Sequence, residues 1–279
     1  MSNAVLALQD VSRHYRGKGG LLRKGDTLRA VDGVDVTLAP GETLGIVGES
    51  GSGKSTLGRL AAGIEPPSAG NVTFKGKPYA PIGSSAWRRQ RRDVQVVFQN
   101  PSQALDPRLS IADQIRGAME AHRLDTGKSG AGSLDALLAR VGLEGLGRRY
   151  PHQLSGGQLQ RAVIARALSL SPDVIVCDEA VSALDVSVQA QILNLLQDLQ
   201  AEFSVAYLFI SHDLGVVRHV SHRIAVMQHG RIVEAGPAGD VFASPRNSYT
   251  KALIAALPAA SPSARRARDA KRRLDFAKV

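Results

Sequence analysis

The chain has 279 residues, of which 43% are hydrophobic and 22% are charged, a composition typical of globular proteins. No apolar run approaches the roughly 18 residues of a membrane-spanning helix, and no signal-peptide cleavage pattern follows Ala4–Leu8. The single cysteine, Cys177, excludes an internal disulfide and any multi-cysteine metal site.

Half of the net charge of +10 lies at the C-terminus, because the last 19 residues hold seven basic and two acidic side chains. This basic tail is either solvated or attracted to anionic lipid. Aromatic residues make up only 4% of the chain, and Trp87 is the only tryptophan. The stacking surface that single-stranded nucleic acid usually needs is therefore weakly represented, and we expect no nucleic-acid partner.

The N-terminal part predicts strands joined by glycine-rich turns. A Gly-, Lys- and Arg-rich loop is predicted from Arg16 to Arg29. Apolar or alternating runs predict strands at Ala4–Leu8, Val34–Leu38, Thr43–Val47 and Val94–Phe98. A helix is predicted at Leu57–Ala62, directly after a glycine-rich turn.

Residues 100–160 predict a helical insertion. Ile111, Ile115, Met119 and His122 recur at helical spacing behind Ser110, a suitable N-cap. This stripe either packs the helical region or receives a partner. A Gly/Ser-rich connector spans 125–133, and a second helical face, at Leu134, Leu137, Leu138 and Val141, is ended by Gly142.

Strands and helices alternate in the remaining chain. We expect a helix at Gly157–Leu170, a long helix around Val188–Leu199, and strands at Val174–Cys177, Val205–Ile210 and Ile224–Met227. Near-continuous apolar strands between helices indicate an α/β fold with a mostly parallel sheet covered on both faces.

The run Gly48-Glu49-Ser50-Gly51-Ser52-Gly53-Lys54-Ser55-Thr56 matches the phosphate-loop pattern G-x-x-x-x-G-K-[ST]. Glycines let the backbone N–H groups point at a phosphate chain, and the following helix adds its dipole. Lys54 would bind the outer phosphates and Ser55 would bind Mg²⁺. A Gly/Ser turn with a solvated lysine is the alternative, but the predicted strand before the loop and the helix after it favour phosphate binding.

Two adjacent carboxylates, Asp178 and Glu179, end the strand that begins at Val174. Asp178 is placed to reach the Mg²⁺ held by Ser55, and Glu179 to orient an attacking water or accept its proton. Without the upstream phosphate loop, the same pair would be interpreted as two surface acids at the start of a turn.

The segment Leu154-Ser155-Gly156-Gly157-Gln158 places a hydroxyl and free N–H groups at a helix start, which makes an anion site or a simple cap. It resembles the signature of ATP-binding cassette (ABC) proteins, and the chain is similar to that family over nearly its full length. The phosphate loop, Gln99, the signature, Asp178-Glu179, Ser182-Ala183-Leu184-Asp185 and His212 follow in the family's order.

The resemblance implies a P-loop NTPase (RecA-like) core with an N-terminal antiparallel β subdomain and an inserted helical subdomain. It also implies that ATP lies between the phosphate loop of one cassette and the signature (Ser155, Gly156, Gly157, Gln158) of another. Tyr15, rather than His14, would stack on adenine, or it is a half-buried strand-edge tyrosine. Gln99 would sense Mg²⁺ and water, His212 would contact the γ-phosphate, and Asp185 would reach across the interface or cap its helix.

Three segments are similar to the ATPase subunits of peptide and nickel importers: Arg91–Pro101, Ala183–Gln191 and Ser248–Leu253. The chain departs from that group at Asn247-Ser248 and Ala180-Val181, and it lacks the C-terminal cysteines of some relatives. The implied function is the ATPase of a bacterial importer for peptides, nickel or opine-type solutes. An exporter ATPase and a soluble ABC ATPase acting on nucleic acid or ribosomes are the alternatives, and a GTPase is disfavoured because no Asn-Lys-x-Asp motif is present.

The importer resemblance implies partners and boundaries. We expect two membrane permeases, a second ABC ATPase subunit of the same or another sequence, and indirectly a solute-binding protein. The expected location is peripheral, at the cytoplasmic face of the inner membrane. The expected divisions are an ABC ATPase domain at 1–258, with an importer-type segment at about 236–258, and a basic tail at 259–279.

Overall fold

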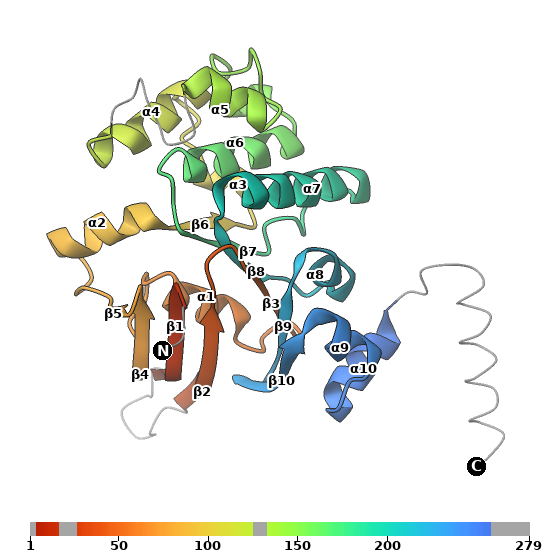
Figure 1. The fold of residues 1–279 in the computed structure, drawn as a ribbon. Coiled ribbons are helices and arrows are strands. Elements are labelled where there is room, and N and C mark those ends of the chain that lie inside the picture. Colours follow the sequence, from red (N-terminus) through yellow and green to blue (C-terminus); the bar gives the residue numbers. More distant parts are fainter. Residues whose placement is uncertain (1–3, 17–26, 125–132, 258–279) are drawn as a thin grey trace, which may run out of the picture.

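The computed structural model describes residues 4–16, 27–124 and 133–257 (Figure 1). Its strands are β1 Leu6–Arg16, β2 Thr27–Leu38, β3 Thr43–Val47, β4 Ala69–Phe74, β5 Lys77–Pro78, β6 Val94–Phe98, β7 Val174–Asp178, β8 Ala206–Ile210, β9 Arg223–Gln228 and β10 Arg231–Pro237. Its helices are α1 Lys54–Ala61, α2 Ser85–Asp93, α3 Pro101–Ala104, α4 Ile111–Ala121, α5 Leu134–Arg140, α6 Gly156–Leu168, α7 Val186–Phe203, α8 Leu214–Val220, α9 Ala238–Ala243 and α10 Ser248–Ala256, with a 3₁₀ turn at Pro151–Gln153.

The described strands form two sheets. The central sheet has the order β10-β9-β3-β8-β7-β6, in which β9, β3, β8, β7 and β6 run parallel and β10 pairs antiparallel with β9. The second sheet is antiparallel, in the order β2-β1-β4-β5. The expected α/β core with a mostly parallel sheet and an N-terminal antiparallel part is therefore confirmed.

Alternate side chains of the central strands pack into two separate cores. On β7, Ile175 and Cys177 join the core shared with α4–α8, whereas Val174 and Val176 join the core shared with α1 and the antiparallel sheet. Both faces of the central sheet are thus covered, as the continuous apolar strands indicate. Figure 1 shows α1 between the two sheets and α3–α7 stacked on the opposite side.

The helical insertion follows the predicted pattern, but its apolar stripe is buried. Ser110 caps α4 by accepting a hydrogen bond from the Asp113 N–H. Ile111, Ile115 and Met119 are only 1%, 1% and 2% exposed, within the core that also contains α5 and α6. The stripe packs the helical region, so these side chains are not available to a partner.

Some elements have no clear sequence signal. Helix α2 has four arginines and buries no residue completely, so it lacks the apolar face that predicts a helix. Strand β2 begins at Thr27, inside the loop predicted from Arg16 to Arg29, and α1 begins at Lys54 rather than Leu57. Most of the Gly/Ser connector and the basic tail lie outside the described residues.

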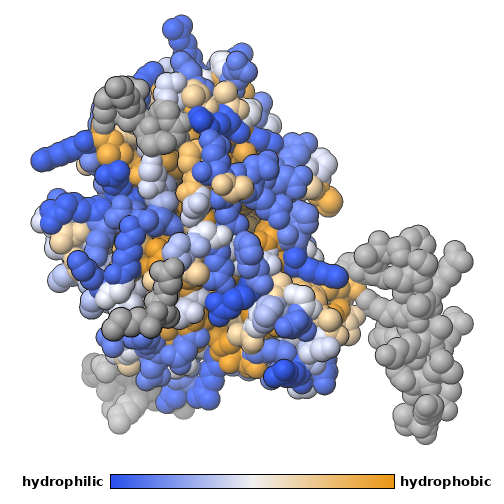
Figure 2. Space-filling view, in the orientation of Figure 1, coloured by the Kyte–Doolittle hydropathy of each residue, from blue (hydrophilic) through white to orange (hydrophobic). Residues whose placement is uncertain are grey.

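The surface is mainly polar. Hydrophilic residues cover most of the face seen in Figure 2, and hydrophobic residues show in small groups, as is usual for a folded domain. Within the described ranges, every helix is too short or too polar to cross a lipid bilayer.

Candidate functional site

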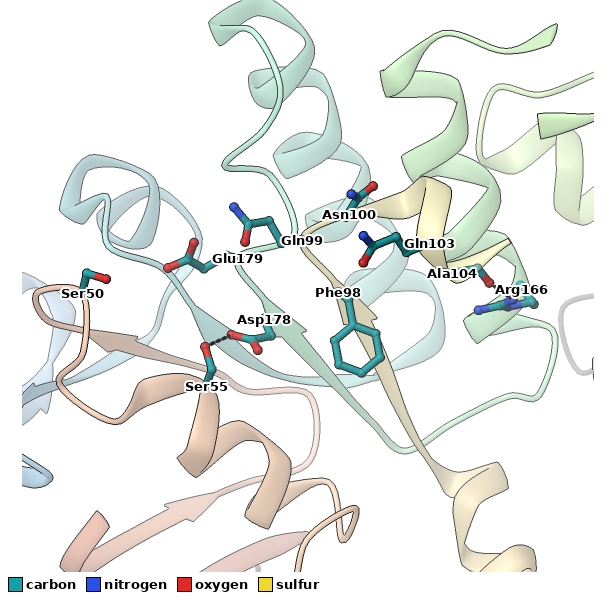
Figure 3. Close-up of a pocket in the computed structure, with 10 residues that line it drawn as sticks. All are labelled: Ser50, Ser55, Phe98, Gln99, Asn100, Gln103, Ala104, Arg166, Asp178 and Glu179. Carbon is teal, nitrogen blue, oxygen red and sulfur yellow. Dashed lines mark hydrogen bonds between the residues drawn. The ribbon is translucent and has the colours of Figure 1, made fainter. Parts of the chain in front are cut away.

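The candidate site lies where three neighbouring parallel strands end. Strand β3 leads into the phosphate loop, β7 ends at Asp178, and β8 is followed by Ser211 and His212. Because parallel strands end at one edge of the sheet, these segments meet in space. Two adjoining hollows of about 630 and 460 Å³ open there and share Ser50, Ser55 and Glu179 as lining residues. Figure 3 shows the residues that line the first hollow.

Two glycines of the phosphate loop are required by close backbone approach. Gly48 has φ 156° and Gly53 has φ 105°. A Cβ at Gly48 would lie 2.1 Å from the Met227 carbonyl oxygen, and one at Gly53 would lie 2.0 Å from that of Ala30. The loop is therefore wedged between the β2 and β9 backbones, and no larger residue fits at either position.

Lys54 is folded back over the loop that precedes it. Its side chain is buried, and Nζ donates hydrogen bonds to the carbonyl oxygens of Gly48 (2.8 Å) and Glu49 (2.7 Å). Burial lowers the pKa of Lys54, and the charges of Glu179 and Asp178 oppose that shift. The third donor of the ammonium group makes only a long contact to Ser52 Oγ, at 3.5 Å, so it can turn to a phosphate oxygen.

Ser55 and Asp178 form a hydroxyl–carboxylate pair from two different elements. Ser55 Oγ donates to Asp178 Oδ1 at 2.8 Å (Figure 3). Burial and the neighbouring Glu179 raise the pKa of Asp178, and the hydrogen bond from Ser55 opposes the rise. Hard oxygen ligands such as these suit Mg²⁺, which takes few protein ligands and adds phosphate and water oxygens. The described residues contain no group of three His, Cys, Asp or Glu side chains that could hold a metal by themselves.

Glu179 lies in the left-handed backbone region, with φ 52°. Its N–H donates to the Ile210 carbonyl oxygen at 3.0 Å, and its own carbonyl accepts hydrogen bonds from the N–H and hydroxyl of Ser182. Such a conformation in a non-glycine residue costs of order 1–3 kcal/mol and is found most often at functional sites. His212 Nδ1 lies 3.3 Å from Glu179 Oε1, so the structure brings these two predicted residues together.

Tyr15 lines the second hollow together with the phosphate loop. Its hydroxyl donates to both carboxylate oxygens of Glu65, at 2.8 and 2.9 Å. The Arg13 guanidinium lies 5.0 Å from the ring centre, and Arg13 is not among the residues lining the hollow. The ring is half-buried at the end of β1, as expected of a strand-edge tyrosine, and it is also available to a flat ligand in the hollow.

Sequence reasoning missed several lining residues. The turn at His229-Gly230, between β9 and β10, lines the second hollow, and the Gly230 N–H donates to the Ser52 carbonyl at 2.9 Å. Gln99 lines the first hollow beside Phe98 and Arg166, whose guanidinium donates to the Ala104 carbonyl. No local pattern marks this turn or this arginine, because their roles come from contacts with distant segments.

The signature residues lie away from these hollows. Ser155 and Gln158 form a reciprocal capping box at the start of α6, with hydrogen bonds of 3.3 and 2.9 Å. A Cβ at Gly157 would lie 2.5 Å from the Val188 side chain, so this glycine also allows α6 to pack against α7. Asp185 caps α7 through the Val188 N–H at 2.9 Å. Both predicted caps are confirmed, and none of these residues is among those lining the two described hollows.

The profile of the family described as ABC transporter matches residues 31–182. A protein of Brucella abortus (strain 2308), named for a role in peptide import as an ATP-binding protein, is 48% identical over 93% of this chain and 77% of its own length. The glutathione import ATP-binding protein GsiA of Escherichia coli (strain K12) is 48% identical over 94% of this chain, which covers 42% of that longer protein.

Solved structures agree with these sequence matches. CbiO1 from Clostridium perfringens, part of the ABC transporter complex cbiONQ, has a TM-score of 0.73 and 28% identity, covering 87% of this chain and 92% of that one. The ATP-binding cassette MJ0796, a dimer in a post-hydrolysis state with ADP and Pi, has a TM-score of 0.71 and 29% identity, covering 84% of this chain and 98% of that one. The chain belongs to the ABC transporter family.

Proposed function

We propose that the chain binds and hydrolyses ATP to power a membrane importer for peptides or a related small solute. The observation that carries this proposal is the meeting of Lys54, Ser55, Asp178, Glu179 and His212 at one edge of the sheet. A lysine, a hydroxyl, a carboxylate pair and a histidine in that arrangement suit phosphoryl transfer from a nucleoside triphosphate to water.

Each group has a defined task in this proposal. The loop N–H groups and the third donor of Lys54 hold the phosphates, and the face of Tyr15 supports the adenine. Ser55 and Asp178 would hold Mg²⁺ together with phosphate oxygens. Gln99 lines the first hollow with both of them, so it would contact the metal through a water molecule. The metal would neutralise charge on the phosphates.

Glu179 is the proposed general base. Glu179 lines both hollows, so a water between its carboxylate and the terminal phosphate can lose a proton to it. Figure 3 shows the side chain in the first hollow. His212 is positioned to hydrogen-bond the carboxylate and the terminal phosphate region, because its ring lies 3.3 Å from Glu179 Oε1. The hydrogen bond from the Glu179 N–H to β8 holds the base and the histidine in fixed register.

A second cassette completes the site. Ser155, Gly156 and Asp185 are exposed at helix starts away from the phosphate loop. Next to Asp185, Val186 is 82% exposed. An exposed valine beside two exposed helix starts fits a surface that is covered when two cassettes pair head to tail. The partner is another copy of this chain or a related one.

The permease is proposed to dock beside Gln99. Phe98 is 43% exposed, although it is a large apolar side chain, and it lines the same hollow as Gln99 and Gln103. This surface replaces the buried stripe of α4 as the candidate docking face. A permease helix bound there would lie next to the residue that contacts the nucleotide site, which would couple transport to hydrolysis.

Single-cysteine cross-linking tests the docking face. Cys177 is fully buried, and burial raises the pKa of its thiol to about 12, so it should not react. We expect Ser102→Cys, in α3, to cross-link to the permease and Ser244→Cys, after α9, to give no product. Cross-linking at Ser244→Cys alone would reject the docking face.

The remaining parts of the proposal concern organisation and cargo. We propose an ABC ATPase domain at 1–258, a helical subdomain at about 100–160, an importer-type segment at about 236–258 and a separate basic tail at 259–279. The subunit would be peripheral, at the cytoplasmic face of the inner membrane, beside two permeases that receive cargo from a solute-binding protein. The two import relatives support peptides as the cargo class.

Reconstitution with the permeases and the second ATPase tests the whole proposal. We expect ATP-dependent peptide uptake into vesicles, and phosphate release stimulated by the loaded binding protein. Hydrolysis that responds to RNA or DNA, and not to the permeases, would favour the soluble alternative and overturn the importer.

A further inference from the structure

The C-terminal helix α10 touches the phosphate loop. The N–H of Glu49 donates a hydrogen bond to the Tyr249 hydroxyl at 3.0 Å, across 200 residues of sequence. Tyr249 belongs to the segment Ser248-Tyr249-Thr250, which the phosphate chemistry itself does not use. We infer that Tyr249 is a positioning residue that holds the first turn of the phosphate loop in its nucleotide-binding shape; this inference rests on the proposed function.

Three different residues hold the backbone of the phosphate loop by hydrogen bonds. Lys54 Nζ bonds the carbonyls of Gly48 and Glu49 from inside the loop. The turn between β9 and β10 bonds the Ser52 carbonyl through the Gly230 N–H. The Tyr249 hydroxyl accepts a hydrogen bond from the Glu49 N–H. The Lys54 ammonium stays at a fixed distance from a bound phosphate only while the two backbone carbonyls that it bonds stay in place.

Tyr249 is itself held firmly. The Asn247 side chain caps α10 by accepting from the Tyr249 N–H at 2.8 Å. The Glu234 carboxylate on β10 accepts the N–H groups of Arg246 and Asn247 at 2.7 and 3.0 Å. Thr250 is fully buried, and the Tyr249 ring packs against the main core. The hydroxyl therefore has a fixed position, as a positioning group requires.

A fixed contact between the loop and α10 makes their stabilities depend on each other. Nucleotide that orders the loop should also hold Tyr249, and hence α10, more firmly, because coupling between two sites is reciprocal. The Glu49 N–H is at the surface, so water can replace the tyrosine oxygen in part. We expect loss of the hydroxyl to weaken ATP binding about two- to fivefold, the size of one net hydrogen bond.

Tyr249→Phe is the test variant, because it removes the hydroxyl and keeps the ring. Tyr207→Phe is the matched control, since the Tyr207 hydroxyl is buried without a hydrogen-bond partner in the structure. We expect Tyr249→Phe to raise the KM for ATP about two- to fivefold with kcat within twofold of the original. We expect Tyr207→Phe to leave both parameters unchanged.

Amide hydrogen exchange on the full chain gives a readout that needs no catalysis. Without nucleotide, the Glu49 amide should exchange about threefold faster in Tyr249→Phe than in the original chain. With ATP and Mg²⁺, the amides of α10 should be protected in the original chain and not in the variant. Unchanged Glu49 exchange and an unchanged ATP dissociation constant in Tyr249→Phe would overturn the inference.

Lys54→Ala in the same binding assay separates the two possible failures. If Lys54→Ala weakens ATP binding and Tyr249→Phe does not, the phosphate loop works as proposed and the role of Tyr249 is wrong. If neither variant changes ATP binding, the assignment of the phosphate loop has failed, and the inference fails with it.

Discussion

Two regions of the molecule differ in how many functional groups they bring together. The first region is formed by the ends of strands β3, β7 and β8, and the second by the starts of helices α6 and α7. At the strand ends, Lys54, Ser55, Asp178 and Glu179 line two adjoining hollows, and His212 Nδ1 lies 3.3 Å from Glu179 Oε1. At the helix starts, Ser155 and Asp185 bond only their own helices and remain exposed. In the proposed function, the first region binds a nucleotide by itself, whereas the second acts on a nucleotide brought by another cassette.

The largest expected effect concerns the base at the strand ends. Glu179→Gln should reduce ATP hydrolysis by about 100-fold or more while leaving ATP binding nearly unchanged, because only proton transfer needs the carboxylate. The trapped nucleotide should hold two cassettes together, which light scattering after size-exclusion chromatography can detect. Hydrolysis at the original rate in the paired complex would show that another group is the base.

Lys54→Ala should weaken ATP binding at the strand ends. The lysine supplies a charged hydrogen bond to phosphate and also holds the Gly48 and Glu49 carbonyls. Loss of one such bond should weaken ATP binding by about 10- to 100-fold. Titration of the full chain with a fluorescent ATP analogue measures this directly, and an affinity within threefold of the original would contradict it.

Ser155→Ala sharpens the comparison, because it removes both a helix cap and the proposed contact to a partner's nucleotide. Ser133→Ala is the matched control, since Ser133 caps α5 through the Ala136 N–H at 3.2 Å. Both variants should lower the free energy of unfolding by about 1 kcal/mol. Only Ser155→Ala should also slow hydrolysis in the paired complex, by about tenfold. Equal hydrolysis in the two variants would leave Ser155 with a capping role alone.

The smallest effect concerns Glu65, which accepts hydrogen bonds from the Tyr15 hydroxyl beside the second hollow. Burial raises the pKa of Glu65, but the hydrogen bond from Tyr15 and the charge of Arg13 outweigh it, so the net shift is downward from 4.5. A lowered pKa means that the carboxylate stabilises the fold above pH 4.5 and loses this effect as the pH falls below it. Glu65→Gln should cost about 0.5–1 kcal/mol at pH 7, because the amide oxygen still accepts a hydrogen bond from Tyr15 but carries no charge.

Urea unfolding at several pH values measures the Glu65 effect. The difference between Glu65→Gln and the original chain should shrink as the pH falls below 4.5. Pairing of the cassettes should not change, because the Glu65 carboxylate bonds Arg13, Tyr15 and Arg59 and not the exposed helix starts of α6 and α7. A difference that grows at low pH would contradict the assigned pKa direction.

Local sequence patterns predicted the strand ends well and the long-range contacts poorly. The phosphate loop and Asp178-Glu179 follow apolar strands directly, so parallel pairing alone brings them together. The contact of Tyr249 with Glu49 joins residues 200 positions apart, and no spacing rule encodes it. The stripe of α4 had the correct period, but a period does not say which neighbour covers the face. Helix α2 was missed because arginines occupy the positions where apolar residues would mark a face.

The left-handed backbone at Glu179 limits how position 179 can change during evolution. At φ 52° the residues that fit with least strain are glycine, asparagine and aspartate. None of them places a carboxylate as far from the backbone as glutamate does. Substitution by glycine would relieve the backbone strain at position 179, but it would also remove the carboxylate. Backbone strain and the proposed chemistry therefore place opposite demands on this one position.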